Sequence, residues 1–145
     1  MRWALYAVFL VLFVTGAGWL VADDLKDSAE IWQQAAAYLL MIHGGATMVV
    51  LLLLGALFPL HMRRGWRARK NRMTGSVMVA FNAVLVVTAF GLYYSGSDVI
   101  RLATGRLHYG IGLALPILML VHIVLGRRAD VDAGSAGSTR TDRTS

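Results

Sequence analysis

The sequence contains no cysteine, and its long apolar segments contain no Asp, Glu, Lys or Arg. Without cysteine the chain can form no disulfide, supply no thiolate ligand and attach no c-type heme covalently. Proton-coupled exporters of this size generally need a carboxylate inside the membrane, so the missing acidic residues argue against that class.

What the chain has in excess is apolar residues, at 57% of 145 with a mean hydropathy of +0.61. They fall into runs long enough to cross a bilayer. We predict an all-α membrane protein, a four-helix bundle with helices over about 3–21, 35–61, 76–94 and 107–126. These would form one domain, 1–128. Residues 129–145 are Gly, Ser, Thr and charged residues with nothing to bury, and are predicted to be a disordered tail.

The positive charge is unevenly placed. Six of the fourteen basic residues lie in the joint between the second and third runs: Arg63, Arg64, Arg67, Arg69, Lys70 and Arg72. Five more lie near the termini, which four crossings put on the same side. This asymmetry predicts that both termini and the basic joint are cytoplasmic, and it favours lipid headgroups over nucleic acid as the ligand of the joint. A dedicated partner site there is the alternative.

A short repeat links the first and third runs. Thr15 and Gly18 in VTGAG recur as Thr88 and Gly91 in VTAFG. Small residues there would let helices, or a flat cofactor, approach closely. Thr74 is expected to cap the third helix.

All four histidines lie in the second and fourth helices. His43 and His61 are 18 residues apart, and His108 and His122 are 14 apart, so at about 100° per residue each pair shares a face. The two helices run in the same direction, which pairs His43 with His108 near the outer surface and His61 with His122 near the inner one. The two spacings differ by four residues, which makes His61 the least secure partner.

Opposed neutral imidazoles suit low-spin heme iron, whereas zinc or copper would need three or four converging ligands. We therefore predict two non-covalent heme b groups with bis-histidine ligation. Gly44 and Gly45 serve either close helix packing or room for a porphyrin edge. Arginines near the sites would pair with heme propionates, Arg106 or Arg101 at the outer site and Arg64 or Arg72 at the inner site.

The segments HGG, LHYGIGL, HIVLG and NRMTG, together with the histidine pattern, resemble the diheme b-type cytochromes of bacterial respiratory chains. The four-helix cytochrome b subunits that serve formate dehydrogenase and nickel-iron hydrogenase are similar. The resemblance implies an inner-membrane protein that carries electrons between the quinone pool and a partner redox protein. It identifies no residues of a quinone site, because the chain has no large loop or extra helix.

The redox partner is left open by the sequence. Four acidic residues of the outer joint could dock a basic c-type cytochrome or could simply be solvated: Asp23, Asp24, Asp27 and Glu30. Another redox subunit, or a second copy of the chain, is also compatible with the pattern. Two other readings are a small four-helix transporter that relays protons through histidine and an anchor subunit without a cofactor; the second leaves the histidines unexplained.

Overall fold

The computed structural model describes the backbone of residues 2–67 and 72–141, and the side chains within 3–57 and 72–128. Within these ranges the chain consists of helices joined by short turns, without strands. The helices are α1 (Arg2–Leu25), α2 (Glu30–Arg67), α3 (Arg72–Tyr94) and α4 (Asp98–Thr141). The predicted all-α fold is confirmed.

Each helix contains a segment long and apolar enough to cross a membrane. These segments are Trp3–Leu25, Glu30–Leu57, Arg72–Tyr94 and Asp98–Arg128. Their outward faces are apolar as well: Leu52, Val87 and Ile117 are exposed at 76%, 69% and 67%. An apolar exterior of this kind suits lipid and not water, which indicates a multi-pass membrane protein.

The helices are longer than we predicted. α2 begins at Glu30 instead of residue 35, and α4 begins at Asp98 instead of residue 107. At the start of α4, the Arg101 amide donates a hydrogen bond to the Ser97 carbonyl at 2.9 Å. Extending an existing helix into polar sequence needs no new nucleation, so the helices continue past the apolar segments from which we predicted them.

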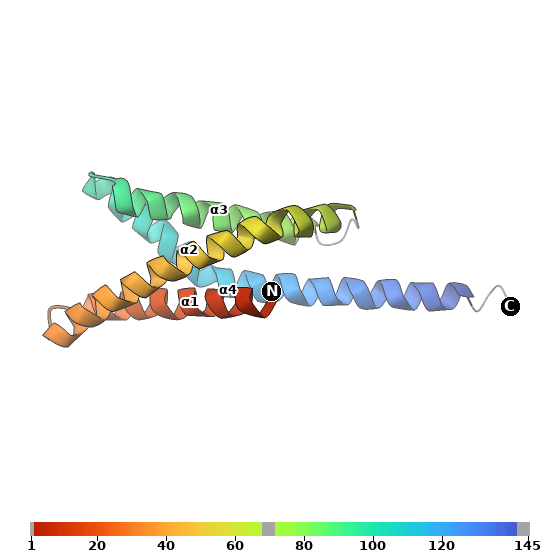
Figure 1. Cartoon of the computed structure of the whole chain (residues 1–145), viewed down its shortest axis with the longest axis horizontal. Helices are drawn as coiled ribbons and strands as arrows, with labels where there is room; N and C mark the ends of the chain where they lie inside the picture. The colour runs from red at the N-terminus through yellow and green to blue at the C-terminus, as the bar shows by residue number, and fades with distance from the viewer. Residues whose placement is uncertain (1, 68–71, 142–145) are drawn as a thin grey trace.

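Helix α4 likewise continues past its apolar segment, beyond Arg128. We predicted a disordered tail over 129–145, whereas the backbone continues as helix to Thr141; residues 142–145 lie outside the described part. This last part of α4 extends alone, away from the other helices (Figure 1). Its helical backbone is thus a continuation of α4 and not the result of packing.

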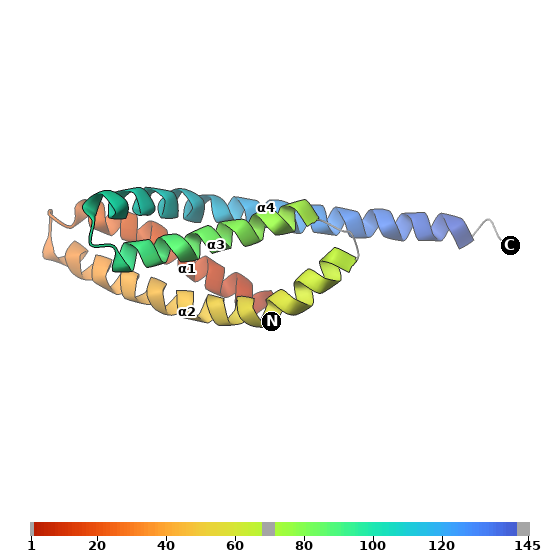
Figure 2. The ribbon, with the colours of Figure 1, turned by 90° about the horizontal axis from the view of Figure 1, so that it is seen from above.

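The helices form two antiparallel hairpins, α1 with α2 and α3 with α4, and α1 also contacts α4. The turns of both hairpins lie at the same end of the bundle, the left side of Figures 1 and 2. We call this the turn end. The core between the hairpins is built on Phe9, Val50 and Leu115, against which residues of α3 such as Phe81 and Leu85 pack.

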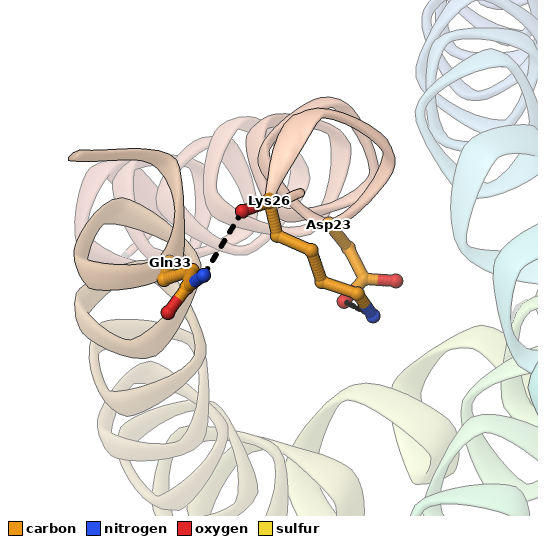
Figure 3. A network of polar contacts seen from close by, with 3 residues as sticks. All are labelled: Asp23, Lys26 and Gln33. Carbon is orange, nitrogen blue, oxygen red and sulfur yellow. Dashed lines mark hydrogen bonds and ion pairs between the residues drawn. The ribbon is translucent and has the colours of Figure 1, made fainter. Parts of the chain in front are cut away.

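The turn between α1 and α2 is closed by polar contacts (Figure 3). The Lys26 ammonium donates to Asp23 at 2.9 Å, and the Gln33 amide donates to the Lys26 carbonyl at 3.2 Å. The hydrogen bond and the charge of Asp23 raise the pKa of Lys26. Stability from this pair is therefore present below the ordinary lysine pKa and is lost as the pH rises through the raised value. Because Lys26 and Asp23 lie at the surface, the pair contributes little.

Candidate functional site

In the first hairpin, a threonine of α1 binds a histidine of α2. Thr15 Oγ1 lies 3.0 Å from His43 Nδ1, and the same hydroxyl donates its proton to the Val11 carbonyl at 2.6 Å. A hydroxyl has one proton, so Thr15 can only accept from the imidazole. From this hydrogen-bond pattern we assign the proton of His43 to Nδ1, which leaves Nε2 unprotonated.

The second hairpin repeats this arrangement between α3 and α4. Thr88 Oγ1 lies 2.9 Å from His108 Nδ1 and donates its proton to the Val84 carbonyl at 2.7 Å. We therefore assign the same tautomer to His108, with its proton on Nδ1 and an unprotonated Nε2.

Glycines extend the repeat by one helical turn. A Cβ at Gly18 would lie 3.4 Å from Leu39, and a Cβ at Gly91 would lie 2.8 Å from Thr104 Cγ2. In both hairpins the glycine follows the threonine by three residues, and the residue it meets precedes the histidine by four. The repeat that we noted in the sequence is thus a structural repeat: it sets the spacing of each hairpin and the partner of each histidine.

The two histidines meet between the hairpins. The ring centres of His43 and His108 are 6.3 Å apart and the ring planes cross at 71°. In the described part of the chain no hydrogen bond reaches Nε2 of either ring. We call His43, His108, Thr15 and Thr88 the turn-side site, because it lies in the half of the bundle nearer the turns.

The two imidazoles of the turn-side site are close enough that they could hold one metal ion between them. Two nitrogens bound to one ion by bonds of about 2 Å place their ring centres roughly 6 Å apart, as these are. Among the described residues, no group of three or more His, Cys, Asp or Glu side chains could hold a metal ion. Two imidazoles alone leave an ion's other positions to a non-protein ligand, which is what a porphyrin provides.

His122 has a partner of the same kind at the other end of the bundle. Thr74 Oγ1 lies 2.9 Å from His122 Nδ1, and a Cβ at Gly75 would lie 3.8 Å from the ring. Thr15 and Gly16 relate to His43 in the same way, with 3.2 Å between a Cβ at Gly16 and His43 Cε1. Our prediction that Thr74 caps α3 is wrong, because α3 begins two residues earlier and the threonine binds a histidine.

The other predicted site residues have different positions. The side chains of His61 and Arg64 lie outside the described residues, so the inner pair of histidines stays a prediction. Arg106 is exposed, two residues before His108. A Cβ at Gly44 would lie 3.4 Å from the Tyr93 hydroxyl, which marks Gly44 as a contact with α3, whereas Gly45 has open space around it.

The threonines are the site residues that sequence reasoning missed. The repeat containing Thr15 and Thr88 was visible, but nothing in it indicated an imidazole partner. Comparisons with protein-family models, with curated proteins and with solved structures find no match to this chain.

Proposed function

We propose that this chain is a diheme b-type cytochrome of the bacterial inner membrane, which carries electrons between the quinone pool and a partner redox protein. His43 and His108 would hold one heme at the turn-side site, and His61 and His122 would hold the second. Heme, when bound, supplies reversible one-electron chemistry.

The observation that carries the proposal is the pair of crossed imidazoles with occupied Nδ1 atoms. Each ring comes from a different hairpin, and each is fixed by a threonine of its own hairpin. Polar atoms at membrane depth are costly when they lack a partner. The hydrogen bonds of both rings in the described part of the chain are made at Nδ1, and a metal bound at Nε2 would give both remaining nitrogens a partner at once. A pair of packing histidines would not need the same tautomer on both sides.

Surrounding residues suit a flat cofactor at this site. Gly16 lets the His43 ring lie against the backbone of α1. Gly45 is exposed on the outside of α2, so the open space around it is not part of this site. Arg106 is the described arginine nearest in sequence to His108, and we assign it to a propionate of the same heme.

The distribution of charge supports the orientation. The basic joint and both termini would face the cytoplasm, which puts the turn end on the outer side of the inner membrane. Asp23, Asp24, Asp27 and Glu30 at that end would face a c-type cytochrome or another redox subunit. The basic joint would bind anionic lipid headgroups.

An electron-transfer assay in proteoliposomes tests this function. We expect a quinol analogue to reduce the heme-loaded protein, seen as growth of the b-type absorbance bands, and oxidised cytochrome c added outside to reverse the change. Vesicles carrying the His108→Ala variant are the matched control, with less reducible heme. A heme-loaded protein that takes no electron from quinol would contradict the link to the quinone pool.

A further inference from the structure

The turn-side rings are not only paired but crossed. Their planes make an angle of 71°, closer to perpendicular than to parallel. An imidazole bound to a metal through Nε2 can still rotate about that bond, so ligation alone does not select this angle. Something in the protein has to hold each ring plane.

The threonines are the groups placed to do this. Each accepts the Nδ1–H of its ring at 2.9–3.0 Å, from a point off the axis about which the ring would turn. Each hydroxyl is itself fixed, because it donates to the carbonyl four residues earlier in its own helix. The plane of His43 is thus set by α1 and the plane of His108 by α3, and the angle between them follows from how the hairpins pack.

We propose that Thr15 and Thr88 are positioning residues that hold the axial imidazoles of the turn-side heme in crossed planes, an inference that rests on the proposed function. Ring orientation has an electronic consequence in ferric low-spin heme. Crossed imidazoles interact equally with the two iron d orbitals that have π symmetry, so these orbitals stay nearly degenerate. Parallel imidazoles split them. Outer-sphere hydrogen bonds are a recognised means of orienting metal-ligating histidines.

Electron paramagnetic resonance (EPR) of the oxidised, heme-loaded protein measures this splitting directly. Near-degenerate orbitals give a single low-field feature with a large maximal g value, and split orbitals give a rhombic signal at smaller g. We expect the large-g feature in the wild type. Thr15→Val and Thr88→Val keep the shape of the side chain but remove the acceptor, and each should shift the same component of the spectrum toward smaller g.

Thr47 provides the matched control. Its hydroxyl donates to the His43 carbonyl at 2.9 Å, a bond four residues back along the helix like those of Thr15 and Thr88. Thr47→Val therefore removes the same intrahelical bond without touching an imidazole nitrogen, and it should leave the spectrum unchanged. Thr15→Ser and Thr88→Ser retain the acceptor and should keep the wild-type signal.

Three outcomes would overturn the inference. A wild-type heme with a rhombic signal would mean that the planes are not crossed. An unchanged spectrum in both valine variants would mean that other groups hold them. A protein whose reduced visible spectrum contains no b-type bands would overturn the proposed function as well, and this spectrum is recorded first, so the two failures are distinguishable.

Discussion

Replacing either His43 or His108 by alanine is expected to remove one heme from the protein, and the same heme in both cases. The ring centres of the two histidines lie 6.3 Å apart on different hairpins, and each ring has one Nε2 that could bind the iron. A low-spin b-type heme needs a nitrogen ligand from each of the two histidines. Removing one histidine should therefore release the heme even though the other histidine is still present. Visible spectra and heme-to-chain ratios of the two variants should therefore agree, with half of the wild-type content remaining.

His122→Ala is the control for this result. His122 binds Thr74 at the other end of the bundle, so its loss should remove a different spectral component. Combining His43→Ala with His108→Ala should add nothing to either change alone, whereas combining His43→Ala with His122→Ala should remove both hemes. If His43→Ala and His108→Ala removed different components, the two histidines could not share one iron.

The second large effect is expected from Gly91. A Cβ at this position would lie 2.8 Å from Thr104 Cγ2, closer than atoms can pack, so Gly91→Ala should push α3 away from α4. Overpacking of this kind costs about 1–3 kcal/mol. Because the glycine lies one turn from Thr88, the change should also loosen the bond from His108 to Thr88. We expect a lower thermal unfolding midpoint in detergent and weaker heme retention.

Two further variants separate this contact from the general effect of replacing glycine. Gly45 has no atom within 4 Å of an added Cβ, so Gly45→Ala should not lower the unfolding midpoint. Thr104→Ser removes the methyl group that clashes and should restore most of the stability when combined with Gly91→Ala. Failure of this rescue would mean that the close approach of α3 and α4 at Gly91 is not what the substitution disturbs.

The membrane helices and the meeting of His43 with His108 could be predicted from the sequence, for a simple reason. Apolar length predicts the spans, and two helices that run in the same direction bring residues at equal depth together. Helix ends could not be predicted as well, because polar residues continue a helix without any apolar signal. The second pair of histidines cannot be compared, since the His61 side chain lies outside the described residues.

The hydrogen bonds of the histidines depend on information that spacing does not carry. Thr15 precedes His43 by 28 residues and Thr88 precedes His108 by 20. The two separations differ, yet both give the same threonine–histidine contact, because the hairpin turns lie at different distances from the two histidines. Which threonine faces which ring is set by turn length and helix rotation together. The sequence repeat indicated a shared role for the threonines, but only the packed hairpins identify the imidazole as their partner.

A count of heme in the purified wild-type protein tests the central claim most directly. The protein would be expressed with heme supplied, purified in mild detergent, and analysed by pyridine hemochrome titration beside oxidised and dithionite-reduced spectra. The account predicts low-spin b-type bands and two hemes per chain. A single heme per chain that is lost in His43→Ala would support heme binding at the turn-side site and would contradict heme binding by His61 and His122. A colourless protein that takes up no heme would contradict the account.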